Sequence, residues 1–134
     1  MPGLTLAEAR RMLDAGLAEA DAIGQPMNVA IVDAGGHLLA FARQDGAIRA
    51  SIDIAQRKAK TSILMEAPTA ALMPLVQPGA ELYGLEQTAG GMVVFGGGIP
   101  AHRDGELVGA VGVSAGSAEQ DVRVAEAAVA ALKA

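Results

Sequence analysis

Two histidines, His37 and His102, have the widest chemical range of any residues in this sequence. An imidazole titrates near neutral pH and binds iron or zinc, so each is a candidate acid/base or metal ligand. Both lie at the end of an expected hairpin strand, where a histidine is also a common surface residue. Neither has a partner at a metal-ligand spacing such as H-x-x-x-H, which argues against a dedicated zinc site.

A glycine-rich turn, Gly96 to Pro100, precedes His102. Consecutive glycines let the backbone approach a ligand closely, and their N–H groups can form a concavity for a carboxylate or phosphate. The same glycines also suit a β-bulge or a crowded sheet edge. No Gly-Lys-Ser/Thr follows, so this is not a Walker-type loop. Gly97, Gly98 and His102 are therefore candidate ligand-binding residues, with His102 as the candidate catalytic proton shuttle.

Arg43 is a further candidate, because a guanidinium recognises a carboxylate through two parallel hydrogen bonds. Four charged residues lie at expected hairpin ends: Asp33, Arg43, Asp45 and Asp104. An aspartate in such a turn usually accepts hydrogen bonds from its own backbone.

A cationic cluster, Arg57, Lys58 and Lys60, is expected on or beside the exposed side of a helix. Lys58 or Thr61 could still reach a pocket at the edge of that helix, so both are candidate ligand-binding residues. The serines offer no Gly-x-Ser-x-Gly frame, which argues against a serine hydrolase.

Length and composition limit the classes of protein. The 134 residues, 51% hydrophobic, suit one domain over residues 1–134. The absence of cysteine excludes disulfides and thiolate chemistry. A net charge of -5 and three aromatic residues (one Tyr, two Phe) argue against nucleic-acid binding. No signal-type segment opens the chain and no apolar run approaches the roughly 20 residues of a membrane helix, so we expect a cytoplasmic protein without a membrane partner.

Capping boxes and turn residues predict the elements that must position these candidates. Thr5 with Glu8 starts a first helix that ends at Gly24, and residues 27–32 and 37–42 form a hairpin. A second helix, with Ile48, Ile52, Ala55, Ala59 and Ile63 on its buried side, leads into an irregular segment over residues 66–89.

Three strands and a final helix are expected in the second half. Residues 92–95, 99–103 and 106–114 are the predicted strands, with a hairpin turn at Asp104-Gly105. Ser117 with Gln120 caps the last helix. Because hairpins dominate, the sequence predicts an antiparallel α+β fold rather than a doubly wound sheet.

Several motifs, in this order along the chain, resemble the GlcG/HbpS family, also called the haem-degrading domain family, which includes the C-terminal domain of PduO-type proteins. The motifs are Val32-Asp33-Ala34-Gly35-Gly36-His37-Leu38, Arg43-Gln44-Asp45-Gly46-Ala47, Lys58-Ala59-Lys60-Thr61, Gly97-Gly98-Ile99-Pro100, residues 104–114 and Asp121. The resemblance covers essentially the whole chain and implies a profilin-like α/β/α sandwich with a central antiparallel sheet. It also implies homo-oligomers, from dimers up to octamers, and haem binding in some members.

The resemblance leads to a first hypothesis, a haem- or tetrapyrrole-binding protein involved in haem or iron redox handling. The first helix contains no histidine, so iron ligation would come from His37, His102, a methionine or Thr61, while Arg43 or Lys58 would pair with a propionate. A second hypothesis is an enzyme or accessory protein for a small carboxylate or hydroxy-carbonyl metabolite. Its pocket would lie at the Gly96–Pro100 turn, with His102 as proton shuttle. A third is an oligomeric scaffold without chemistry of its own.

Overall fold

The computed structural model describes residues 3–133 and contains three α-helices, four strands and short 3-10 segments. The main elements are α1 Leu6–Ile23, β1 Asn28–Asp33, β2 Leu38–Arg43, α2 Ala50–Met65, β3 Gly98–Arg103, β4 Glu106–Ser114 and α3 Ala118–Ala130. The 3-10 segments are η1 Thr69–Val76, η2 Leu85–Gln87 and η3 Ala131–Lys133.

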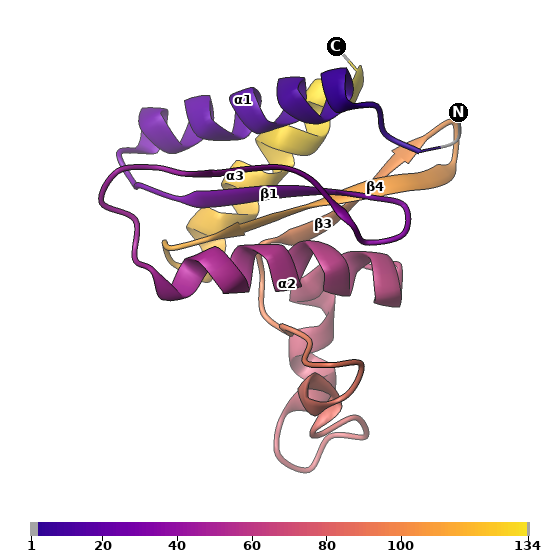
Figure 1. Ribbon diagram of the computed structural model, residues 1–134. Coiled ribbons are helices and arrows are strands. Elements are labelled where there is room, and N and C mark those ends of the chain that lie inside the picture. Colours follow the sequence, from indigo (N-terminus) through magenta and orange to yellow (C-terminus); the bar gives the residue numbers. More distant parts are fainter. Residues whose placement is uncertain (1–2, 134) are drawn as a thin grey trace.

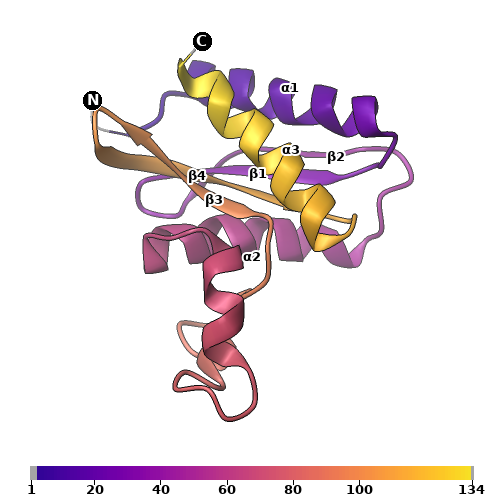
Figure 2. The ribbon, with the colours of Figure 1, turned by 180° about the vertical axis from the view of Figure 1, so that it is seen from behind.

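The four strands form one antiparallel sheet in the order β2-β1-β4-β3. Helices α1 and α3 cover one face of this sheet and α2 covers the other (Figures 1 and 2). The predicted α+β, profilin-like α/β/α sandwich is therefore confirmed. No helix among residues 3–133 is long and apolar enough to cross a membrane.

The first and last helices begin where the sequence predicts. The Thr5 hydroxyl accepts from the Glu8 N–H while the Glu8 carboxylate accepts from the Thr5 N–H. Ser117 and Gln120 make the same reciprocal pair at α3. These bonds satisfy N–H groups that have no partner within a helix, so they fix both starting points.

The two faces of the sheet pack at different distances from their helices. A large aliphatic core lies under α1 and α3, whereas α2 approaches the sheet through small residues. A Cβ at Gly112 of β4 would overlap the Ala55 carbonyl oxygen and lie 2.6 Å from the Ala59 nitrogen. Helix α2 therefore rests directly on the backbone of β4, which requires glycine at this position.

The predicted strand over residues 92–95 is wrong. These residues form no sheet ladder, and the Val93 N–H donates to the Thr61 hydroxyl instead of to a neighbouring strand. Ile48 was also expected to be buried, but it precedes α2 and is 60% exposed. Both errors arise because a short apolar segment near a helix or sheet looks the same in sequence whether it joins that element or only leads into it.

Residues 66–97, which we call the arm, extend away from the body of the molecule below α2 (Figure 1). The arm has its own small apolar cluster, built on Leu72, Val76 and Val94. It joins the body at both of its ends, next to α2 and next to β3.

The contact between α2 and β4 gives a first prediction. Gly112→Ala is expected to lower the free energy of unfolding by about 1–3 kcal/mol or more, because the added methyl group has no room beside Ala55. Urea denaturation followed by circular dichroism measures the change. Gly3→Ala is the matched control, since its Cβ would meet nothing closer than 4.0 Å. Equal stability of the two variants would contradict this account of the layer spacing.

Candidate functional site

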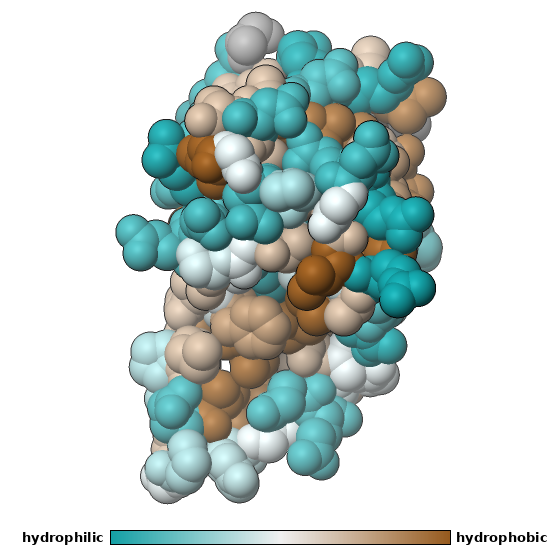
Figure 3. Space-filling view, turned by 90° about the vertical axis from the view of Figure 1, so that its left-hand side faces the viewer, coloured by the Kyte–Doolittle hydropathy of each residue, from teal (hydrophilic) through white to brown (hydrophobic). Residues whose placement is uncertain are grey.

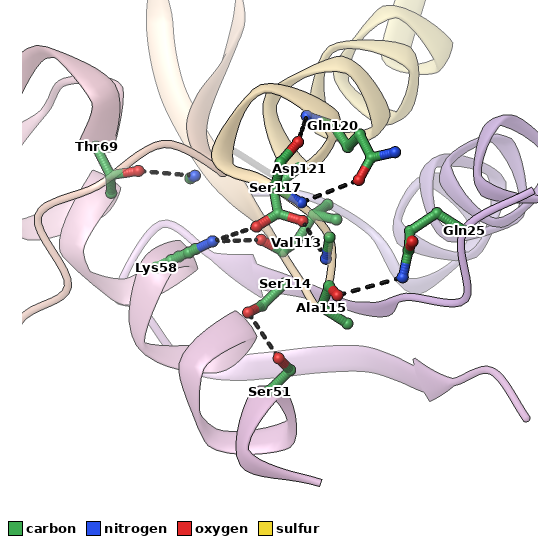
Figure 4. Close-up of polar contacts among 12 residues, drawn as sticks. Gln25, Ser51, Lys58, Thr69, Val113, Ser114, Ala115, Ser117, Gln120 and Asp121 are labelled. Atoms are coloured by element: carbon green, nitrogen blue, oxygen red, sulfur yellow. Dashed lines mark hydrogen bonds and ion pairs between the residues drawn. The ribbon is translucent and has the colours of Figure 1, made fainter. Parts of the chain in front are cut away.

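Lys58 is buried, contrary to the expectation that it lies in a solvated cationic cluster. Its side chain is 0% exposed, and its Nζ donates to Asp121 Oδ2 at 2.9 Å and to the Val113 carbonyl at 2.8 Å (Figure 4). The ammonium also lies 4.9 Å from the centre of the Phe95 ring. Residue 58 faces inward because α2 turns this side toward β4 and α3.

Burial lowers the pKa of Lys58 and raises that of Asp121, and in each case the charged partner opposes the shift. Asp121 also accepts from the Gly116 N–H through its second oxygen. Every polar group of the pair has a partner inside the protein. The pair therefore joins α2, β4 and α3, and it is not available to a ligand in solution.

The candidate residues Gly97 and Gly98 lie against Lys58, and Thr61 is one turn further along α2. A Cβ at Gly97 would lie 2.6 Å from Lys58 Nζ, and the Gly98 N–H donates to the Thr69 hydroxyl at 2.9 Å. Thr61 donates to the Arg57 carbonyl and accepts from the Val93 N–H. Where it faces Lys58 and Thr69, the glycine turn is in close contact with protein atoms, which favours the interpretation of Gly97 and Gly98 as a close-packed sheet edge. Gly98 also lines an apolar hollow of about 490 Å³ between the arm, β3 and α3.

The other candidates lie apart from this cluster. Arg43 is exposed at the end of β2, beside a hollow of about 440 Å³ that reaches Asp21 and Gly24 at the end of α1. His102 is exposed on the edge strand β3, next to a break in its register with β4. The structure therefore does not assemble the six predicted ligand-binding residues into one site.

His37 lies at a separate cleft of about 450 Å³, between the β1–β2 turn, α2 and residues 89–91 of the arm. Its imidazole Nδ1 is 3.5 Å from Asp33 Oδ1. Leu38, which is 50% exposed, supplies apolar surface, whereas Val32 is only 2% exposed. Three polar side chains of α2 line the other wall, with Lys60 one turn further on: Asp53, Gln56 and Arg57. An imidazole, an apolar wall and cationic groups thus converge on one opening.

The β1–β2 turn is tied by its own hydrogen bonds. Asp33 Oδ1 accepts from the Gly35 and His37 N–H groups, both at 2.9 Å, as the sequence predicts for an aspartate in such a turn. Although burial opposes the shift, these N–H groups and the imidazole hold the pKa of Asp33 below its usual value. Asp33 therefore stays ionised beside His37.

The two cations of the cleft have different roles. Arg57 is held by Asp53 at 2.6 Å and by the Gly90 and Gly91 carbonyls, so it fastens the arm to α2. Lys60 is exposed, and its side chain passes over the turn, with Cγ 3.3 Å from where a Cβ of Gly36 would lie. Lys60 is thus positioned for an anion in the cleft.

The sequence predicts that Arg57 and Lys60 belong to a solvated face of the helix. Their spacing of three residues places them on one side of α2, which was a usable signal. The sequence does not show that the distant β1–β2 turn faces this side of the helix. Among residues 3–133, no three His, Asp or Glu side chains gather in an arrangement that could hold a metal ion.

These motifs and this fold define a known family. The family model described as "Haem degrading protein HbpS-like" matches residues 4–130. The chain therefore belongs to the HbpS-like family, which confirms the resemblance identified in the sequence.

Two relatives match over nearly the whole chain. An uncharacterised 15.0 kDa protein from the dhaT-dhaS intergenic region of Citrobacter freundii is 43% identical over 94% of this chain and 89% of its own. The corrinoid adenosyltransferase PduO of the same organism is 41% identical over 96% of this chain. This chain spans only 39% of the length of PduO.

One solved structure with a similar fold is that of a haem complex. The crystal structure of a PduOC:heme complex matches with a TM-score of 0.92 and 40% identity, covering 96% of this chain and 94% of that one. The similar protein was thus crystallised with haem.

The buried ion pair gives a second prediction. Lys58→Met is expected to cost about 3–5 kcal/mol, because it leaves the Asp121 carboxylate buried without its cation. The double variant Lys58→Met/Asp121→Leu is expected to recover part of this loss, since no uncompensated charge remains. Urea denaturation measures both.

Lys60→Met is the matched control, because it removes an exposed lysine from the same helix and is expected to change stability by less than about 0.5 kcal/mol. A Lys58→Met variant as stable as this control would show that the pair does not hold the layers together.

Proposed function

We propose that this protein binds haem in the cleft beside His37. The observation that carries the proposal is the placement of an exposed imidazole, held near Asp33, at the mouth of a cleft that also holds Lys60. The family and the haem complex of the similar PduOC protein support haem as the ligand.

The donor set of the cleft fits this group. His37 would hold the iron through an imidazole nitrogen, Leu38 would pack against part of the ring, and Lys60 would pair with a propionate. Lys60 thus takes the role that sequence analysis gave to Lys58 or Arg43, because Lys58 is buried in its ion pair and Arg43 lies beside a different hollow.

Bound haem would supply iron redox chemistry, which His37 and the other side chains of the cleft would tune. Arg57 contributes by fastening residues 90 and 91, which form one wall of the cleft.

A small-carboxylate pocket at the Gly96–Pro100 turn has less support. The turn is packed against Lys58, Val113 and Thr69. The hollow that opens beside Gly98 and Ile99 is mainly apolar, and His102 is not among its lining residues.

A haemin titration tests the proposal. The wild-type protein is expected to give a saturable, one-to-one shift of the Soret band, and His37→Ala is expected to abolish it. His102→Ala is the matched control, because it removes the other exposed histidine from a strand outside the cleft, and it is expected to bind as the wild type does. Binding lost in His102→Ala and kept in His37→Ala would overturn the assignment.

Lys60→Met in the same titration tests the propionate contact. An exposed ion pair contributes about 0.2–1 kcal/mol, so the affinity is expected to fall about 1.4- to fivefold at low salt. The difference is expected to shrink as salt is added, because exposed charges are screened. An unchanged affinity at low salt would remove Lys60 from the site.

We also propose that the protein forms a homo-oligomer, between a dimer and an octamer. The support is apolar surface: large hydrophobic side chains are exposed on the arm and next to it, and Figure 3 shows such surface on the lower part of the molecule. They are Leu64, Met73, Leu75, Tyr83 and Phe95. An apolar hollow of about 490 Å³ between α3, β3 and the base of the arm adds to this surface.

Light scattering during size-exclusion chromatography tests this proposal. The wild type is expected to run as an assembly, and Leu75→Glu is expected to shift it toward the monomer, because a charge on the arm is costly to bury. Ile48→Glu changes an equally apolar exposed residue away from the arm and is expected to leave the assembly unchanged. A monomeric wild type would contradict the proposal.

A further inference from the structure

We infer that Asp33 is a positioning residue for His37: its carboxylate holds the proton on Nδ1 and turns Nε2 outward as the nitrogen that binds haem iron. This inference rests on the proposed haem function and identifies the residue that prepares its ligand. It follows from three contacts in the β1–β2 turn.

The first contact is between the two side chains. Asp33 Oδ1 lies 3.5 Å from His37 Nδ1, just beyond the usual hydrogen-bond distance, and the imidazole is 83% exposed, so it has room to rotate toward the carboxylate. A carboxylate only accepts hydrogen bonds, so it selects the tautomer that carries its proton on Nδ1. The unprotonated Nε2 is then the nitrogen free to bind a metal.

The second contact fixes the carboxylate itself. The same oxygen accepts from the backbone N–H groups of Gly35 and His37, and the Asp33 N–H donates to the His37 carbonyl at 2.8 Å. The acceptor and the imidazole are therefore parts of one hydrogen-bonded turn. The carboxylate cannot turn away without breaking two backbone bonds.

The third contact is steric. A Cβ at Gly35 would lie 3.0 Å from His37 Nδ1 and 3.1 Å from Cε1. The imidazole thus rests against the backbone of Gly35, on the side of the ring that faces Asp33. A methyl group at residue 35 would therefore press against the ring, which would have to shift by a few tenths of an ångström.

The arrangement has two consequences for bound iron. A histidine ligand whose second nitrogen donates to a carboxylate is better oriented and more basic, and losing such a partner typically weakens metal binding about 10- to 100-fold. A more basic ligand also favours ferric over ferrous iron. Removing the carboxylate is therefore expected to raise the reduction potential, by about 59 mV for each tenfold loss of ferric preference.

The experiment uses Asp33→Asn, Gly35→Ala and the control Asp104→Asn. Asp104 lies in the other hairpin turn with φ 51, a conformation that asparagine tolerates, so this control makes the same charge change away from His37. For each protein we would record ¹⁵N NMR spectra of the imidazole without haem, the haemin affinity and the reduction potential of the complex.

The wild type and Asp104→Asn are expected to show the Nδ1–H tautomer, and Asp33→Asn is expected to lose it. Asp33→Asn is expected to bind haemin about 10- to 100-fold more weakly, with a higher potential. Gly35→Ala keeps the carboxylate but displaces the ring, so it is expected to weaken binding as well. Circular dichroism spectra and urea midpoints close to those of Asp104→Asn would show that the variants fold.

Two outcomes separate this inference from the proposed function. If His37→Ala abolishes haemin binding while Asp33→Asn matches Asp104→Asn in tautomer, affinity and potential, the role of Asp33 is overturned and the haem site stands. If His37→Ala binds haemin as the wild type does, the haem site is overturned and Asp33 loses its role in it. A wild-type protein with its imidazole proton on Nε2 would overturn the inference directly.

Discussion

The buried ion pair between Lys58 and Asp121 is the contact on which the arrangement of the layers depends. One ammonium group meets a carboxylate from α3, a carbonyl from β4 and the ring of Phe95 from the arm. Burying two charges is costly, and such a pair is better explained by the specific geometry that it enforces than by net stabilisation. Any shift of α2 or α3 along the sheet would leave a charge without its partner, so the pair fixes both helices in register.

Glycine allows the backbone to meet these constraints. At Gly97 and Gly98 the chain passes beside Lys58, and at Gly112 helix α2 rests on β4, all at distances that a Cβ would prevent. The close approach of α2 to the sheet brings its outer side next to the β1–β2 turn. The cleft beside His37 lies between these two elements, with the arm as its third wall. Thus the packing of the core determines the shape of the cleft, and Val32 belongs both to the core under α2 and to the lining of the cleft.

The cleft combines a rigid turn with adaptable side chains. Backbone hydrogen bonds hold Asp33 and the start of His37, whereas the imidazole and Lys60 are exposed and can adjust to a ligand. A preorganised carboxylate beside a movable imidazole suits a ligand that binds reversibly, because the orientation of the nitrogen is restored each time the site empties. The fastening of the arm by Arg57 links this site to the apolar arm, which is the surface we assign to assembly.

The sequence by itself determined most of the local structure. Capping boxes at Thr5 and Ser117, the glycine after the first helix and the turns at residues 33–36 and 104–105 act through bonds between near neighbours, so their effects can be predicted from order alone. The sequence motifs also identified the family, and the fold followed from it. The site required the tertiary structure, since burial and long-range contact depend on what packs against a residue. Lys58 and Lys60 are two residues apart on one helix, yet one faces a carboxylate 63 positions away and the other faces a turn and solvent. Long-range packing also distinguishes the two histidines. The fold places His37 beside Asp33 and a cleft, and it leaves His102 exposed on an edge strand.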